Sequence, residues 1–213
     1  MKRNLLIAFL LLFIFVCYAQ NDSITYPSVK GISLHRGITV ADVISKLQTK
    51  GCTKVLLNSP ELSGASILKG SYSGFDSQFT ILPCKQNKQL AGIVNVKLPE
   101  RETWTQLKND YDYLKSLLSK KYFAFATQEG FSSSLIDIEE YGTNSDKLDA
   151  IKDDEGVFKT EFYPVNNEAG FIYGRIILVI SHVTVDYNTT YYVSVSYITP
   201  SNVEEQIAEL GDV

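Results

Sequence analysis

The chain has 213 residues, of which 45% are apolar and 12% aromatic. This composition excludes intrinsic disorder, collagen-like repeats and small scaffolds held only by disulfides, and it is sufficient for a globular core. The formal net charge is −4, and the lysines and arginines are scattered along the sequence. Nucleic acid is therefore a disfavoured partner, because a phosphate backbone is held by clustered basic side chains.

The first nineteen residues resemble an export signal. Lys2 and Arg3 precede an apolar run over residues 5–16, and the small residue Ala19 follows it. This order predicts a secretory signal peptide over residues 1–19, which places the mature chain in the periplasm or outside the cell. A lipid anchor on Cys17 is the alternative, although Val16 stands where such motifs normally carry Gly or Ala. No later run approaches the roughly 20 apolar residues of a membrane-spanning helix.

The next part of the sequence predicts a polar leader, a helix and a meander of strands. Residues 20–36 are polar and contain Pro27 and Gly31, which suggests a leader that is extended or partly mobile. From Thr39 onwards, apolar residues recur at helical spacing, and Thr39 with Asp42 forms a capping box, so a helix is predicted over residues 39–50. The period then changes to two, typical of strands. The predicted strands are 53–57, 65–72, 75–83 and 90–98.

A second helix opens the other half of the chain. It is predicted over residues 103–120 from an apolar stripe at spacings of 3 and 4. Short strands at 122–127 and 133–139 and a weak helix at 145–153 follow. The last elements are a three-stranded meander and a final helix in which Ser201 would be the N-cap and Glu204 the N3 residue. The apolar stripe of the second helix is Trp104, Leu107, Tyr111, Leu114 and Leu118. The strands of the last meander are predicted at 157–163, 170–183 and 190–198, and the final helix at 201–210.

Because the predicted strands are grouped between helices, the fold class is α+β, with antiparallel meanders packed against amphipathic helices. The boundaries are a helix and meander over residues 37–100, and a long helix, second meander and C-terminal helix over residues 101–213. This order is compatible with two diverged α-β-β-β halves.

Two cysteines remain after residue 19. Cys52 and Cys84 form an even number in a chain expected to reach an oxidising compartment, which predicts one disulfide between them. Two buried free thiols are the alternative.

Motifs for catalysis, nucleotides or metals are absent from the sequence. His35 and His182 are the only histidines. A serine of the run 132–134 could in principle combine with His182 and Asp186, but no G-x-S-x-G turn positions it. Acidic residues cluster at 137–140 and 153–155 without the spacing of a calcium loop. We therefore expect no catalytic residues, no cofactor and no metal site.

The segment Gly37-Ile38-Thr39, with Asp42, Val43 and Leu47 at helical spacing and a meander after it, resembles the opening of exported modules grouped with the β-lactamase-inhibitor-protein and SmpA/OmlA folds. The whole chain also resembles exported proteins of Bacteroides-type bacteria. The resemblance implies a binding or assembly role outside the cytoplasm, without catalysis, and it carries over no functional residues.

Two hypotheses for function follow. In the first, the chain is a non-catalytic binding module that offers an exposed sheet face, or the turn 71–75 with Tyr72 and Phe75, to another exported protein or an envelope component. In the second, the acidic clusters serve a calcium-dependent glycan binder or a hydrolase.

Overall fold

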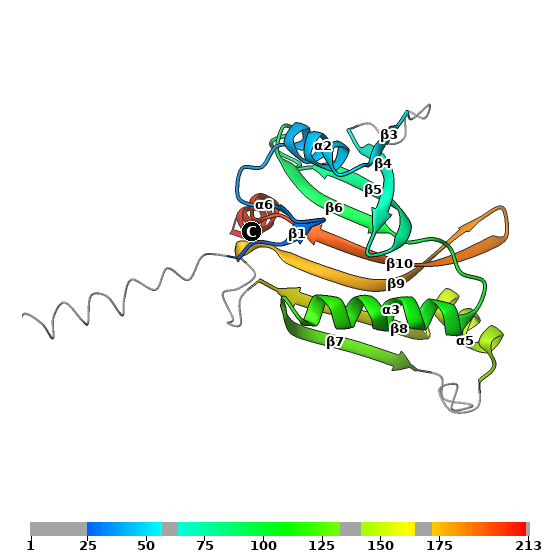
Figure 1. Ribbon diagram of the computed structural model, residues 1–213. Helices are drawn as coiled ribbons and strands as arrows, with labels where there is room; N and C mark the ends of the chain where they lie inside the picture. The colour runs from blue at the N-terminus through cyan, green and yellow to red at the C-terminus, as the bar shows by residue number, and fades with distance from the viewer. Residues whose placement is uncertain (1–24, 57–63, 133–141, 165–171, 212–213) are drawn as a thin grey trace, which may run out of the picture.

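A single antiparallel sheet organises the molecule (Figure 1). The computed structural model describes residues 25–56, 64–132, 142–164 and 172–211. Its large sheet has eight strands in the order β3-β4-β5-β6-β10-β9-β8-β7, and every neighbouring pair is antiparallel. The α+β prediction is confirmed. The strands are β3 Thr53–Val55, β4 Ser66–Tyr72, β5 Phe75–Pro83, β6 Ala91–Lys97, β7 Phe123–Phe131, β8 Gly156–Tyr163, β9 Arg175–Val185 and β10 Asn188–Ile198.

The sheet consists of two meanders that meet at one strand pair. The first meander runs from β3 to β6 and the second from β7 to β10, and β6 pairs with β10 in the middle. Each meander follows a helix in the sequence, α2 (Val40–Thr49) or α3 (Trp104–Ser119). The two segments therefore share one continuous layer. Their origin by duplication stays a prediction.

The two helices that the sequence predicted most clearly begin where their caps place them. Thr39 accepts a hydrogen bond from the Asp42 amide while the Asp42 side chain bonds back to Thr39, which completes the capping box of α2. Thr103 caps α3 through the amide of Gln106. All five residues of the predicted apolar stripe on α3 are buried. A shorter helix, α5 (Asn144–Lys152), packs beside α3 and β8.

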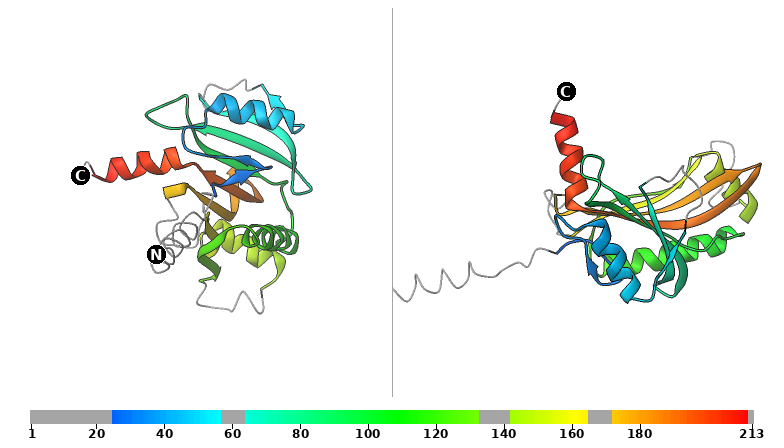
Figure 2. Two further views of the ribbon diagram at one scale, coloured as in Figure 1. Left: turned by 60° about the vertical axis from the view of Figure 1, so that its left-hand side comes forward. Right: turned by 90° about the horizontal axis from the view of Figure 1, so that it is seen from above.

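The core lies between the sheet and one layer of helices. Helices α2 and α3 both lie on the same side of the sheet, and α6 (Pro200–Gly211) rises from the other side (Figure 2). Alternate residues of each strand point into the core, for example Leu68, Phe79, Val96, Val195 and Leu178, which lie on neighbouring strands in one row. The hydrophobic core is therefore one body across both meanders.

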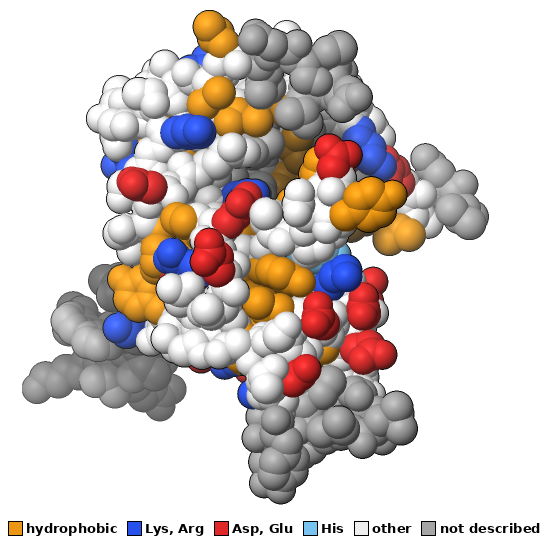
Figure 3. Space-filling view, turned by 90° about the vertical axis from the view of Figure 1, so that its right-hand side faces the viewer, with side chains coloured by type: hydrophobic (Ala, Val, Ile, Leu, Met, Phe, Trp, Pro, Cys, Tyr) orange, Lys and Arg blue, Asp and Glu red, His pale blue; other side chains and the backbone are white. Residues whose placement is uncertain are grey.

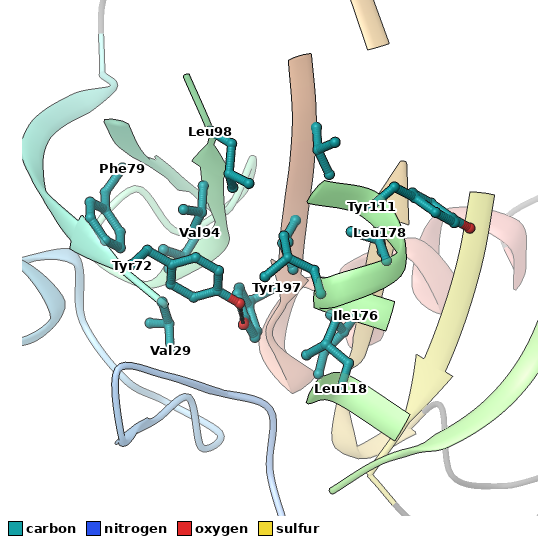
Figure 4. Packing of buried hydrophobic residues seen from close by; sticks show 14 of the residues in the cluster. Val29, Tyr72, Phe79, Val94, Leu98, Tyr111, Leu118, Ile176, Leu178 and Tyr197 are labelled. Atoms are coloured by element: carbon teal, nitrogen blue, oxygen red, sulfur yellow. Dashed lines mark hydrogen bonds between the residues drawn. The ribbon is translucent and has the colours of Figure 1, made fainter. Parts of the chain in front are cut away.

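A buried pair of tyrosines crosses the boundary between the meanders. The hydroxyls of Tyr72 on β4 and Tyr197 on β10 lie 2.5 Å apart inside the core (Figure 4). The pair satisfies two polar atoms that burial would otherwise leave without partners.

The described part of the polar leader, from residue 25 onwards, folds into a short hairpin. Residues Ser28–Val29 (β1) and Ile32–Ser33 (β2) form a hairpin whose turn residues Lys30 and Gly31 have positive φ angles of 49° and 73°. Val29, Ile32 and Leu34 are buried in the core. The sequence did not predict this hairpin, because three apolar residues spaced among polar ones give no clear periodic signal in so short a run.

The cap of the last helix was also predicted wrongly. The side chain of Thr199, not that of Ser201, accepts from the amide of Asn202. Helix α6 therefore starts at Pro200, which suits a first helical position because proline fixes φ and lacks an amide hydrogen there. Ser201 instead accepts a hydrogen bond from the Gly37 amide, and Glu204 pairs with Arg36.

Several predictions fall on residues outside the described ranges. They concern the signal peptide at residues 1–19, the lipid anchor at Cys17, the strand 133–139 and the acidic cluster 137–140. Across residues 25–211, apart from the gaps named above, no helix is long and apolar enough to span a bilayer.

Candidate binding face

One face of the sheet carries no layer of helices in the described part of the chain. We call it the open face; it consists of the outward-pointing residues of β4 to β10, with α6 standing at one end of it (Figure 2). Strand β9 shows how the two faces differ. Ile176, Leu178 and Ile180 are at most 6% exposed on the core side, whereas the outward residues that alternate with them, Ile177, Val179 and Ser181, are only half-buried.

The centre of the open face is apolar along β9 and polar along its neighbours. The outward residues of β9 include Ile177, Val179, Val183 and Val185, with Ser181 between them. On β10 and β6, the residues on this face are mostly hydroxyl or amide side chains, and Asn95 donates to Ser196 at 2.9 Å. The outward residues of these two strands are Thr190, Tyr192, Ser194, Ser196 and Ile198 on β10 and Ile93, Asn95 and Lys97 on β6.

A polar groove of about 640 Å³ borders the β4–β6 side of the open face. Lys69, Gln78 and Lys97 lie in one row across the three strands. Lys97 is held in place because its ammonium group is 2.9 Å from Glu100 and 4.2 Å from the ring centroid of Tyr192. Asp76 supplies the second carboxylate of this groove, so its two lysines and two acids balance.

A smaller groove lies where α6 meets the end of the sheet. Its volume is about 190 Å³, and we call it the α6 groove; it is lined by Tyr163, Arg175, Val203, Gln206, Ile207 and Leu210. The Arg175 guanidinium donates at 3.4 Å to Glu161 and at 3.1 Å to Gln206. Its Nε atom is buried and has no acceptor among the described residues. Phe125 stacks on Tyr163 at 4.5 Å beside this groove.

The two aromatic side chains of the predicted binding turn are turned inward, although Ser71, Ser73 and Gly74 are exposed. Tyr72 is only 6% exposed and bonds to Tyr197, so its ring is not part of the surface. Phe75 is half-buried and lies edge-on to Tyr113 at 5.8 Å. Strand parity would have revealed this, since Leu68, Gly70 and Tyr72 share one face of β4 and Leu68 is clearly a core residue.

The predicted disulfide does not form: Cys52 and Cys84 are both buried free thiols. Cys52 precedes β3 and packs against Gly70, which pairs with Ser77 on β5. Cys84 lies seven residues beyond Ser77, or roughly 23 Å further along the strand direction. A disulfide needs Cα atoms within about 7 Å, so the two cysteines are at opposite ends of β5 and cannot meet.

The residues considered for catalysis do not converge. His182 lies on β9, and Asp186 is in the turn four residues later, roughly 13 Å along the strand. Ser132 donates to the Glu155 carbonyl instead, and His35 is exposed in a loop. Asp153, Asp154 and Glu155 end α5 and form a turn in which Asp154 has a φ of 60°. The described residues contain no group of three or more side chains able to hold a metal ion.

Two perturbed titratable groups, Tyr111 and Glu129, lie where α3 meets β7. Burial raises the pKa of Tyr111 above its usual value. Its hydroxyl lies 2.8 Å from both Glu129 and Thr160. Burial opposes the charged form of Glu129, but hydrogen bonds from Lys115 and Tyr111 outweigh it, and the pKa of that carboxyl is lowered. Tyr111 and Lys115 both belong to α3 and both donate to Glu129 on β7, so the cluster joins that helix to the edge strand.

Comparisons of the chain with family models, with curated proteins and with solved structures find no match. The resemblance to the β-lactamase-inhibitor-protein and SmpA/OmlA folds therefore stays a prediction.

Proposed function

We propose that this protein is a non-catalytic, exported binding module whose open face contacts another exported protein or a component of the cell envelope. The observation that carries the proposal is the outward row of β9. In an antiparallel sheet with one face in water, outward residues are normally polar. On β9, Ile177, Val179, Val183 and Val185 are apolar on the outward side as well.

The size of this row suits a macromolecular partner. From Ile177 to Val185 the strand advances roughly 27 Å. Extended apolar surface rimmed by polar groups is typical of interaction sites. The rim here consists of hydroxyl and amide side chains and of charged ones such as Lys97, which pairs with Glu100. A protein surface can match such a mixture of apolar contacts and neutral hydrogen bonds.

Site-specific photo-crosslinking tests the proposal. A photoreactive residue replaces Val179 on the open face or, as a matched control, Tyr113 on α3, which is 46% exposed on the opposite side. Each protein is mixed with an envelope extract from cells that produce the chain. We expect a discrete adduct with another molecule from position 179 only, and excess unlabelled protein should abolish it. Equal labelling from both positions, or the lack of any such adduct, contradicts the proposal.

Competition by a charged variant tests the same contact. Val179→Glu places a charge in the apolar row without touching the core, because Val179 points away from it. The variant should fold normally and should fail to compete for the adduct. A Lys108→Ala variant on the helical side should compete as well as the unaltered protein.

A further inference from the structure

The β9–β10 hairpin projects beyond the rest of the sheet. Pairing of β10 with β6 covers Ser194 to Ile198, and pairing of β9 with β8 ends at Val179. Arg101 still bridges to Tyr191. Past that point, among the described strands, residues 183–190 pair only with each other. The hairpin curves to the side of the sheet on which α6 rises (Figure 2).

An aromatic residue stands at the tip of this hairpin. Asp186 and Tyr187 form the two-residue turn, with φ angles of 47° and 67°. Positive φ at both residues is the pattern of a type I′ turn, and glycine adopts such angles without strain. Here a tyrosine occupies the second position and is fully exposed, at 102%. Viewed from this end, hydrophobic side chains are exposed among charged ones (Figure 3).

The α6 groove at the opposite end of the open face has the complementary chemistry. Its walls are apolar, with Ile207 and Leu210 46% and 76% exposed. Arg175 has five N–H donors, and the described contacts use two of them. Its side chain remains 30% exposed. A cavity of about 190 Å³ beside a partly free guanidinium suits one aromatic side chain next to a carboxylate.

We propose that the occupant of the α6 groove is the hairpin tip of a second copy of this chain. Tyr187 enters the apolar groove, and the Asp186 carboxylate accepts hydrogen bonds from the Arg175 guanidinium. Tip and groove lie roughly 36 Å apart along β9. Two copies with their open faces opposed and their strands antiparallel therefore make both contacts at once, which closes a twofold dimer.

The dimer goes beyond the proposed function and does not depend on it. Because the two open faces are opposed, an external partner has to compete with the second copy. The crosslinking experiment distinguishes the two, since a self-adduct has twice the mass of the chain and a partner adduct does not.

Sedimentation equilibrium on protein purified from cells that express the whole sequence tests the dimer. We expect a concentration-dependent monomer–dimer equilibrium. Tyr187→Ala and Leu210→Glu should each raise the dissociation constant about 30-fold or more, as loss of a central interface anchor does. Tyr113→Ala and Leu56→Glu are the matched controls, because Tyr113 and Leu56 are exposed away from both contacts. Circular dichroism verifies that each variant folds.

Three results overturn the proposal. They are a monomer up to the highest soluble concentration, a dimer that Tyr187→Ala leaves unchanged, and equal weakening by the control variants.

Discussion

Removing the hydroxyl of Tyr72 should destabilise the protein without leaving a cavity. Tyr72→Phe keeps the ring in the core but takes away the group that lies 2.5 Å from the Tyr197 hydroxyl. Within the described residues, Tyr197 bonds through its side chain to Tyr72 alone, and it is only 2% exposed. The variant therefore leaves a buried hydroxyl without a partner, which costs about 1–3 kcal/mol of unfolding free energy.

The reverse change should cost less. Tyr197→Phe leaves the Tyr72 hydroxyl, which has Ser73 as a second neighbour that can bond to it. The double variant with both substitutions has no orphaned hydroxyl at all. Its cost should therefore not exceed that of Tyr72→Phe alone, which corresponds to a coupling between the two sites at least as large as the cost of Tyr197→Phe.

Urea unfolding of the four proteins measures this coupling. The slope of unfolding free energy against urea concentration should be the same in all four, which shows that the compactness of the states has not changed. Additive costs of the two single substitutions would refute the reasoning, and so would a cost for Tyr72→Phe below about 0.5 kcal/mol.

Three further predictions follow from the interior. Burial raises the pKa of Tyr72 from 10.0 to about 12. The contribution of the Tyr72 hydroxyl to the unfolding free energy is therefore complete below pH 10 and is lost as the pH rises towards 12. Alkaline urea titrations should show this loss, and Tyr72→Phe should reduce it. Gly174→Ala should lower the unfolding free energy by more than about 2 kcal/mol in the same assay, because Gly174 has a φ of 97° and an added Cβ would lie 2.5 Å from the Ile198 carbonyl oxygen; a neutral result would contradict this contact. Burial raises the pKa of the Cys84 thiol to about 11, so peptide mass spectrometry should find Cys52 and Cys84 alkylated at pH 8 only after unfolding; a Cys52–Cys84 crosslink would contradict the fold at β5.

Local signals in the sequence were sufficient to locate most of the elements. The capping box of Thr39 and Asp42, the stripe beginning at Trp104 and the turn residues between strands all act within a few residues of chain, and the structure has helices and strands at those positions. The cap of α6 was placed two residues late because Thr199 and Ser201 are both plausible caps, and only Pro200 between them favours the earlier start.

The candidate site was predicted less well, because it depends on contacts between distant residues. Tyr72 looked like a surface residue in a turn, but its partner Tyr197 lies 125 positions away. The thiols of Cys52 and Cys84 could be counted from the sequence, whereas their separation depends on how β4 and β5 align. The apolar outward row of β9 could be recognised in the sequence as part of a continuous hydrophobic run. The sequence did not indicate which residues of that run would remain uncovered.

The sequence by itself determined the α+β class and the antiparallel meanders, since periodicity, caps and turns are properties of neighbouring residues. Only the tertiary structure decided that both meanders join edge to edge in one sheet, with α2 and α3 on one side and α6 on the other. That arrangement depends on the pairing of β6 with β10, whose residues are about a hundred positions apart. Strand pairing between such distant residues depends on shape and burial across the whole core. No short segment of the sequence determines these quantities.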